Sequence, residues 1–366
     1  MSDQAIRDRI KEFEEELKNT KYNKRTQHHI GLVKAKIATL KEKIEQRKKG
    51  KGKTTGYSVK RTGDATAVLV GFPSVGKSTL LNKITNADSK VGEYDFTTLT
   101  VIPGLLEYNH AKIQILDVPG IIQGAADGSG RGKEVLAAVR SADIIIILLD
   151  INQLHHLKII EKELYEAGIR LNQKKPDIRI RKKSKDGIRI GATVKLDIEE
   201  ETIKAILQEF RITNADVLIR SEINEDQLID AIETNRIYIP GIIVINKSDT
   251  ATIEDIKKVE QQYKDALVIS AKNEDNLDKL TQTIFEKLEL IRIYLKKPGK
   301  EADLKEPLVL RHNSSLRDLC EKIHRDFVTK FKFARVWGAT AKYNGQMISR
   351  LDKELHDRDI VELHMR

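Results

Sequence analysis

The sequence has a single cysteine, Cys320, among its 366 residues. One cysteine cannot form an internal disulfide or a cysteine metal cluster, and it is typical of a reducing compartment. Long apolar runs are also absent: the longest, Ile144–Leu149, is far shorter than the ~20 residues needed to cross a bilayer. The amino-terminal stretch MSDQAIRDRI has no apolar signal-peptide core. We therefore expect a soluble cytoplasmic protein with no membrane partner.

Histidines in a metal-ligand pattern are missing too. His28 and His29 are adjacent, as are His155 and His156, so the two side chains of each pair point in different directions. Zinc ligands follow other spacings. We expect these histidines to be surface or structural residues.

Positive charge is in excess by +10, and the excess lies in one segment. Residues 1–62 contain 18 Lys or Arg and 8 Asp or Glu, whereas the other 304 residues hold 47 of each sign. Such a basic segment indicates a polyanionic partner, with RNA as the first candidate. The alternative is a basic helical face that contacts only solvent.

Two helices are predicted within this basic segment. Apolar residues recur there at spacings of three and four, which place them on one face of a helix. They are Ile6, Ile10, Phe13 and Leu17, then Ile30, Val33, Ile37, Leu40 and Ile44. Polar residues 20–25 interrupt the pattern, so the helices form a hairpin, and the basic, glycine-containing stretch 47–56 is a linker. We assign residues 1–62 to this hairpin and linker.

Strands and helices alternate in the middle of the chain. Short β-rich runs, each followed by a polar loop, occupy residues 66–71, 112–120, 142–150, 240–249 and 265–272. This alternation predicts a doubly wound α/β sheet with ligands at the carboxyl ends of its strands. We assign residues 63–165 and 238–290 to one such domain.

Two further segments have a different pattern. Residues 166–237 read as an α+β insertion, with a basic hairpin over 174–190 that turns at Asp186-Gly187, then helices over 198–210 and 224–233. Residues 291–366 read as a compact α+β module. Its strands are predicted over 308–312, 333–338 and 359–365, and its one helix over 314–327.

The first chemical motif is GFPSVGKST, residues 71–79, which matches G-x-x-x-x-G-K-[ST] between a strand and a helix. Gly71 and Gly76 let the backbone turn its N–H groups toward phosphate oxygens, while Lys77 reaches the β- and γ-phosphates. The Ser78 hydroxyl is the expected Mg²⁺ ligand. The residues predicted to bind nucleotide here are Phe72, Pro73, Ser74, Val75, Gly76, Lys77, Ser78 and Thr79.

The second motif, NKSD at residues 246–249, selects the base. The Asp249 carboxylate can accept hydrogen bonds from guanine N1–H and N2, donors that adenine lacks, and a buried carboxylate left unpaired is costly. Asn246 would brace the phosphate loop, and the Lys247 stem would cover the base. After the next strand comes SAK, Ser270, Ala271 and Lys272, in which the Ala271 N–H would meet guanine O6. The sequence therefore predicts GTP rather than ATP.

The third motif, DVPG at residues 117–120, follows a strand. Asp117 would hold Mg²⁺ through water, and the Gly120 N–H would sense the γ-phosphate. Upstream, DFTTLT supplies Thr97 and Thr98, of which one should ligate Mg²⁺, with Thr98 favoured. These segments should order with the γ-phosphate and relax after hydrolysis. The expected catalytic residues are Lys77, Thr98 and Gly120, and the expected metal ligands are Ser78, Thr98 or Thr97, and Asp117.

One catalytic side chain is absent. Ras-like proteins place a water-orienting Gln after the glycine of this motif, but here Ile121 follows, and Gln123 is two residues out of register. Hydrolysis should therefore be slow and should need another group. The candidates are a positioned backbone group, a partner's side chain, Arg131, or a K⁺ ion near the phosphates. GTPases that use K⁺ often carry Asn where this chain has Ser74.

With these motifs in place, the chain resembles the developmentally regulated GTP-binding (DRG) family, within the Obg-like class of P-loop GTPases. The resemblance rests on GFPSVGKSTLL, YDFTTLTVIPG, DVPGIIQGAADGSGRG, NRIYIP, NKSD and SAK, and covers nearly the whole chain. It implies a doubly wound α/β GTPase domain with an α+β insertion, a basic amino-terminal helical hairpin and a carboxy-terminal β-grasp TGS domain. It also implies a GTP-dependent switch in translation that binds the ribosome or RNA, and a protein partner that stabilises the GTPase.

Two alternative functions stay open. One is a ribosome-assembly GTPase like the Obg proteins, although those carry a glycine-rich amino-terminal domain in place of this basic hairpin. The other is an RNA-binding scaffold whose nucleotide site serves only structure, a reading that Ile121 allows. Whichever of these functions holds, we expect a monomer that binds GTP or GDP with Mg²⁺.

Overall fold

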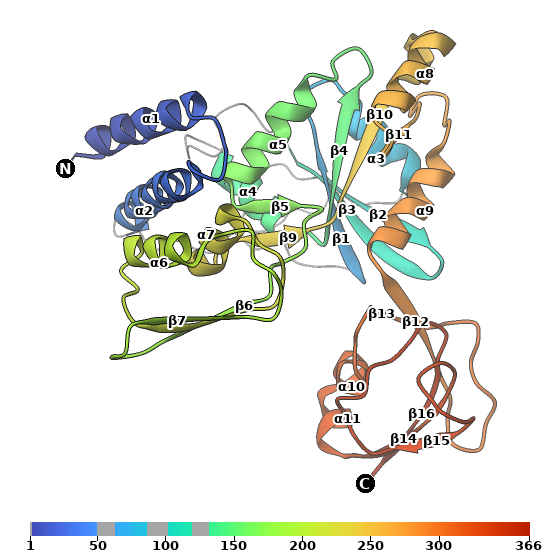
Figure 1. Cartoon of the computed structure of the whole chain (residues 1–366). Coiled ribbons are helices and arrows are strands. Elements are labelled where there is room, and N and C mark those ends of the chain that lie inside the picture. Colours follow the sequence, from blue (N-terminus) through green and yellow to red (C-terminus); the bar gives the residue numbers. More distant parts are fainter. Residues whose placement is uncertain (1, 50–62, 86–101, 119–131) are drawn as a thin grey trace. The chain divides into compact units, whose positions relative to one another are not determined.

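Figure 1 shows the computed structural model of the chain, which describes residues 2–49, 63–85, 102–118 and 132–366. The chain divides into two compact units. The first unit combines residues 1–56 with 173–238, and the second combines 57–172 with 239–366. Most of the expected linker lies outside the described residues. No helix within the described ranges is long and apolar enough to cross a membrane.

A six-stranded sheet forms the centre of the second unit, in the order β11-β10-β4-β1-β3-β2 (Figure 1). Its strands are β1 (Ala65–Val70), β2 (Ile102–Tyr108), β3 (Ala111–Asp117), β4 (Ile144–Asp150), β10 (Gly241–Asn246) and β11 (Ala266–Val268). Every neighbouring pair is parallel except β2 with β3. All seven residues of β4 are buried, as expected for a strand covered on both faces. The predicted doubly wound α/β sheet is confirmed.

The edge strand β2 has no counterpart in the sequence-based prediction. It pairs antiparallel with β3 through a tight turn in which Asn109 and His110 have positive φ angles of 49° and 67°. Two consecutive positive φ angles are typical of a two-residue hairpin turn. Asn and His adopt such angles more readily than most residues, but Asn-His is not one of the dipeptides that predict this turn.

Helices follow the strands of this sheet. They are α3 (Lys77–Ile84), α4 (Gly132–Arg140), α5 (His156–Glu166), α8 (Ile253–Gln262) and α9 (Leu277–Lys287), with the short 3₁₀ helix η1 (Ser248–Thr250). Leu80, Leu81 and Ile84 of α3 are buried in the same core as the sheet residues Ile113 and Ile146. Strands β5 (Ile169–Leu171) and β9 (Ile237–Ile239) form a separate two-stranded ladder. This core therefore fixes the ends of the strands that precede the loops carrying the sequence motifs.

The second unit also contains a five-stranded sheet in the order β13-β12-β16-β14-β15. Its elements are β12 (Leu290–Leu295), β13 (Leu308–Arg311), α10 (Leu316–Ile323), α11 (Arg325–Thr329), β14 (Phe331–Trp337), β15 (Gln346–Ile348) and β16 (Ile360–Met365). The single helix predicted over 314–327 is wrong in one respect, because His324 is extended, with φ −171° and ψ 147°, and separates α10 from α11. Ion pairs from Arg311 to Asp143 and from Lys322 to Asp64 connect this sheet to the central one.

The first unit begins with the predicted helical hairpin, α1 (Asp3–Asn19) and α2 (Gln27–Lys49). Eight of the nine apolar residues predicted from their spacing form one cluster, and the ninth, Ile30, is buried as well. The rest of the unit contains β6 (Ile178–Lys182), β7 (Ile188–Ala192), α6 (Glu200–Glu209), β8 (Ala215–Ile219) and α7 (Glu225–Glu233). Its strands form a three-stranded sheet in the order β6-β8-β7.

The basic hairpin predicted over 174–190 is wrong. Asp186 and Gly187 do turn the chain with φ angles of 79° and 69°, but β6 and β7 do not pair with each other. Strand β8 lies between them, antiparallel to β6 and parallel to β7. The reason is burial, because Ala215, Val217 and Ile219 of β8 become the centre of the unit's core.

Helix α2 packs directly on the inserted segment. Ala35 and Ala38 of α2 belong to the same buried cluster as Ile203 and Ile206 of α6. A Cβ on Gly31 would lie 3.1 Å from the Thr202 methyl group, so glycine permits this close approach of the two helices. The Lys34 amine pairs with Asp226 of α7 at 2.8 Å. One side of α2 thus belongs to the hydrophobic core of the insertion, while its other apolar residues pack with α1.

Candidate nucleotide site

The loop between β1 and α3 has the backbone that a phosphate-binding loop needs. Ser74 and Gly76 have positive φ angles of 64° and 97°. A Cβ on Gly76 would lie 2.4 Å from Asn246 Nδ2, and one on Gly71 would lie 2.4 Å from the Leu148 carbonyl oxygen. Real Cβ atoms do not approach other atoms so closely. Both glycines of the motif are therefore required by their neighbours as well as by conformation.

Lys77 is the first residue of α3, and its amine folds back over the loop. Its Nζ donates hydrogen bonds to the carbonyl oxygens of Gly71, at 3.1 Å, and Phe72, at 3.0 Å. Burial lowers the pKa of Lys77 below its ordinary value, although the negative charge of Asp117 acts in the opposite direction. A partly desolvated ammonium at a helix amino terminus is a strong site for an anion.

Ser78 and Asp117 come together from different elements. The Ser78 hydroxyl, on α3, donates to Asp117 Oδ2, at the end of β3, over 2.8 Å. A hydroxyl and a carboxylate side by side are the hard oxygen donors that Mg²⁺ prefers. Within the described ranges, no three His, Cys, Asp or Glu side chains are grouped to hold a metal. The donor set thus fits a Mg²⁺ that takes its remaining ligands from nucleotide and water.

Asn246, at the end of β10, connects three segments of the site. Its Nδ2 donates to the Val75 carbonyl in the phosphate loop at 2.9 Å, and its Oδ1 accepts from the Ala271 N–H at 2.9 Å. The residue is only 2% exposed, so both bonds are shielded from water. The phosphate loop, the base motif and the SAK segment are therefore held in one fixed arrangement.

Asp249 and Ser270 form the second contact at this edge of the sheet. The Ser270 hydroxyl donates to Asp249 Oδ1 at 2.7 Å, and Ser270 also accepts from the Asn273 N–H at 3.1 Å. Ser270 is fully buried, whereas Asp249 is exposed. The bond orients the carboxylate and leaves Oδ2 available to a ligand.

Two residues at the site were not identified from the sequence. Asp150, at the end of β4, accepts from Lys247 Nζ at 2.8 Å and from the Asn152 N–H at 2.9 Å. Burial raises the pKa of Asp150, but the hydrogen bonds from Lys247 and Asn152 outweigh burial and hold that pKa below its ordinary value. His156 stacks on the Phe72 ring with centroids 4.0 Å apart. The sequence shows only that Asp150 ends an apolar run; its place beside the strand that carries NKSD comes from the pairing of β4 with β10.

Several predicted residues make no contact that places them at the site. The side chains of Pro73 and Thr79, within the phosphate-loop motif, and of Lys272, at the end of SAK, are exposed. Thr97, Thr98 and Gly120 lie outside the described residues, as do Ile121, Gln123 and Arg131. The described part of the site therefore contains the phosphate loop, Asp117 and the base motifs, without the expected switch segments.

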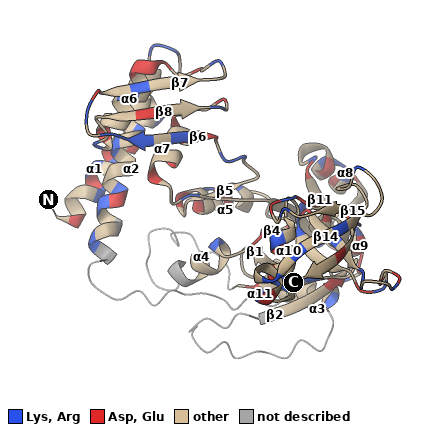
Figure 2. Ribbon diagram, turned by 90° about the horizontal axis from the view of Figure 1, so that it is seen from below, with Lys and Arg blue, Asp and Glu red and all other residues tan. Residues whose placement is uncertain are grey.

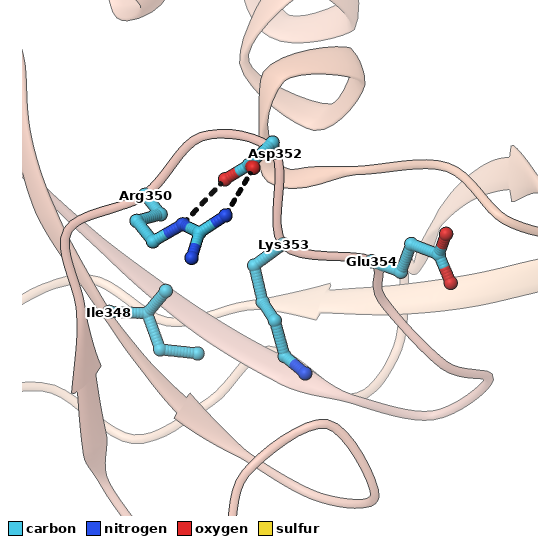
Figure 3. A pocket seen from close by; sticks show the side chains of 5 residues that line it. All are labelled: Ile348, Arg350, Asp352, Lys353 and Glu354. Carbon is cyan, nitrogen blue, oxygen red and sulfur yellow. Dashed lines mark hydrogen bonds and ion pairs between the residues drawn. The ribbon is translucent and has the colours of Figure 1, made fainter.

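A surface pocket lies elsewhere, beside the five-stranded sheet. It is lined by Ile348, Arg350, Asp352, Lys353 and Glu354 (Figure 3). Arg350 and Asp352 point toward one another and form two hydrogen bonds, of 3.0 and 2.6 Å. This pairing already satisfies both charged groups, and no residue of the nucleotide motifs lines the pocket.

Three family models match consecutive parts of the chain, and the start of the last one coincides with the start of the five-stranded sheet. The model described as 50S ribosome-binding GTPase matches residues 66–183, the model for the carboxy-terminal region of that domain matches 185–290, and the TGS domain model matches 291–365. With the α/β sheet and the phosphate loop described above, these matches define a P-loop GTPase with a carboxy-terminal TGS domain.

Comparison with whole proteins identifies the family. The chain is 53% identical over 364 residues to an uncharacterized GTP-binding protein of Methanocaldococcus jannaschii, covering 98% of this chain and 93% of that protein. It is 44% identical to developmentally-regulated GTP-binding protein 1 of Xenopus laevis and to ribosome-interacting GTPase 1 of Saccharomyces cerevisiae. Each of these alignments covers 97% of this chain and 98% of the relative. The chain belongs to the developmentally regulated GTP-binding protein family.

Proposed function

We propose that this protein binds GTP with Mg²⁺, hydrolyses it to GDP and phosphate, and acts as a nucleotide switch in translation by binding the ribosome or RNA. The observation that carries the nucleotide part is the side chain of Asn246. Its two hydrogen bonds join the phosphate loop to the SAK segment, which supports a single pocket for both phosphates and base.

Each residue of the pocket has a role in this proposal. The Lys77 amine exchanges its hydrogen bonds with Gly71 and Phe72 for the β- and γ-phosphate oxygens, and the loop N–H groups bind the same anion. Ser78 and Asp117 would hold Mg²⁺, which supplies positive charge to the phosphates when it is bound. Asp249, oriented by Ser270, accepts from guanine N1–H and N2. Asp249 is exposed in the free protein, and a bound adenine would displace water from its carboxylate without offering a donor, so ATP is disfavoured.

Catalysis in this proposal is slow without help. Ile121 has no group that can orient the attacking water, so the barrier is lowered mainly by charge around the phosphates. We propose Thr98 as a Mg²⁺ ligand, with Thr97 as the alternative, and Gly120 as the γ-phosphate sensor. The catalytic help that Ile121 cannot give would come from K⁺, or from a group supplied by the ribosome or by a stabilising protein partner.

Two observations support a role in translation: the basic amino-terminal segment and the name of one relative. The whole charge excess of the chain lies in residues 1–62, which fits a polyanionic partner. One relative of similar length is named a ribosome-interacting GTPase, and we extend that interaction to this protein. We also propose that it acts as a cytoplasmic monomer.

Steady-state phosphate release from GTP tests this function, measured in KCl and in NaCl at equal ionic strength, with ATP as the substrate control and Lys77→Ala as the variant control. We expect GTP-specific turnover that Lys77→Ala abolishes. Faster turnover in KCl would indicate a cation-assisted mechanism, and equal slow turnover would indicate activation by a partner. Turnover of ATP as fast as GTP, or none of either even with ribosomes, would contradict the proposal.

A further inference from the structure

The three-stranded sheet of the first unit has one covered and one exposed face. On the covered face, alternating isoleucines of β6 and β7 pack with β8, α6 and α7 in one core. The alternate positions point the other way and carry Arg179 and Arg181 on β6 and Arg189 on β7. All three arginines are exposed. The exposed face of this sheet therefore presents guanidinium groups from both edge strands.

The register places these arginines around the central strand. Arg181 and Arg189 both lie opposite Asp216 of β8, one on each side, and Arg179 lies opposite Leu218. Since neighbouring strands are ~4.8 Å apart, Arg181 and Arg189 are separated by about 10 Å across the sheet. We call Arg179, Arg181 and Arg189 the arginine face.

The positive charge of the arginine face is not neutralised within the first unit. Asp216 is the one acidic residue at the outward positions of these strands, and it is already paired with Lys183. Among the described residues, none pairs with Arg179, Arg181 or Arg189. In Figure 2, strand β6 is largely blue, the colour of Lys and Arg.

Basic and acidic residues of the insertion occupy different parts of its sequence. The net charge of the insertion as a whole therefore gives no sign of the arginine face. Residues 174–195 contain nine Lys or Arg and two Asp or Glu. Residues 196–233 contain three Lys or Arg and eleven Asp or Glu. The acidic part supplies α6 and α7, and Asp226 there pairs with Lys34 of the basic hairpin. The two totals nearly cancel, so composition alone attributes all of the basic excess to residues 1–62.

We infer that the arginine face binds the phosphate backbone of RNA, an inference that rests on the RNA contact in the proposed function. The planar guanidinium groups form paired hydrogen bonds with phosphate oxygens. A protein partner would need buried aromatic or aliphatic anchors, and a membrane surface would need apolar side chains to insert. None of the large exposed hydrophobic side chains in the described ranges lies on β6, β7 or β8.

The test compares two triple variants of the full chain. The first, Arg179→Gln, Arg181→Gln and Arg189→Gln, removes the arginine face. The matched control, Lys257→Gln, Lys264→Gln and Lys279→Gln, removes the same charge from exposed positions of the second unit. Binding of a fluorescent oligouridylate, of an RNA hairpin and of vesicles of anionic lipid is measured over a range of KCl concentrations, and GDP binding checks the fold.

We expect the arginine variant to bind RNA about tenfold to a hundredfold more weakly at 0.1 M salt. The slope of log K against log salt should fall by about 2, since each lost phosphate contact on a single strand contributes roughly 0.7. The lysine control should retain wild-type RNA binding, and both variants should bind GDP normally. The single variants Arg179→Gln and Arg189→Gln should each show part of the loss, which separates lost contacts from misfolding.

Two results would overturn the inference in distinguishable ways. If the wild type binds RNA and the arginine variant binds it equally well with the same salt slope, the RNA contact lies elsewhere and the proposed function survives. If the wild type binds neither RNA probe, or binds vesicles of anionic lipid but no RNA, the RNA part of the proposed function fails together with the arginine face.

Discussion

The side-chain amide of Asn246 donates a hydrogen bond to the carbonyl of Val75 over 2.9 Å, although 171 residues separate the two in sequence. The same side chain accepts from the Ala271 N–H. One buried residue therefore sets the distance between the phosphate end and the base end of the pocket.

Replacing Asn246 with Ala should lower both stability and nucleotide affinity. The change leaves the Val75 carbonyl and the Ala271 N–H unpaired in a buried place, at a cost of about 1–3 kcal/mol for each group. Urea unfolding of the nucleotide-free protein and titration with fluorescent GDP measure the two effects. The control is Asn344→Ala, which truncates an exposed asparagine. Equal stability of the two variants would show that the Asn246 contacts are not formed.

Gly76→Ala should be more damaging than another glycine substitution at positive φ. Gly76 and Gly299 have φ angles of 97° and 73°, but a Cβ on Gly299 meets nothing within 4 Å. Gly299→Ala should therefore cost only the backbone penalty, about 1–2 kcal/mol. Gly76→Ala should cost more and should weaken GDP binding, because its Cβ would displace the Asn246 amide. The melting temperatures of the two variants should differ; similar values would contradict the close approach.

Asp150→Asn should destabilise the protein in a pH-dependent way. The folded-state pKa of Asp150 is lowered, so its ionised form stabilises the fold at pH values above the unfolded pKa of ~3.9. The stability difference between wild type and variant should be complete at neutral pH and should shrink as the pH falls below about 4. Urea unfolding across that range measures it. A difference that grows on acidification would contradict the Asp150–Lys247 pairing.

Ala35→Asp should separate the amino-terminal hairpin from the insertion. Ala35 is fully buried in the core that α2 shares with α6, and an unpaired carboxylate there costs several kcal/mol. Hydrogen exchange of α6 and α7 should accelerate while GDP affinity is retained. Lys43→Asp, which places a carboxylate at an exposed position of α2, should leave exchange unchanged. Slow exchange in Ala35→Asp would mean that the insertion folds without the hairpin.

Much of this architecture follows from local sequence patterns. The parallel strands are continuous apolar runs, and the hairpin helices have regular apolar spacing, so both could be predicted. Strand β8 could not, because its short run of Ala215, Val217 and Ile219 becomes a strand only when it inserts between β6 and β7. Likewise, the residues around Ala35 in the sequence do not indicate that it packs against α6, more than 160 residues further along the chain.

The nucleotide site was predicted from motifs rather than from geometry. The motif residues Lys77, Ser78, Asp117 and Asn246 do come together, since the carboxyl ends of parallel strands meet at one edge of the sheet. Asp150 belongs to no motif, and its role depends on Lys247 reaching it across two adjacent strands. Contacts of this kind need the register of the sheet, which the sequence alone does not supply.

We propose that Asp249, oriented by Ser270, recognises guanine. Competition against fluorescent GDP, with GDP, ADP and xanthosine diphosphate as competitors, tests it on the wild type and on Asp249→Asn. The wild type should prefer GDP strongly. In Asp249→Asn, affinity for GDP should fall by about a hundredfold or more, and xanthosine diphosphate should become the better competitor, because an amide can donate to the xanthine oxygen. Unchanged guanine selectivity in Asp249→Asn would contradict the assignment of this pocket.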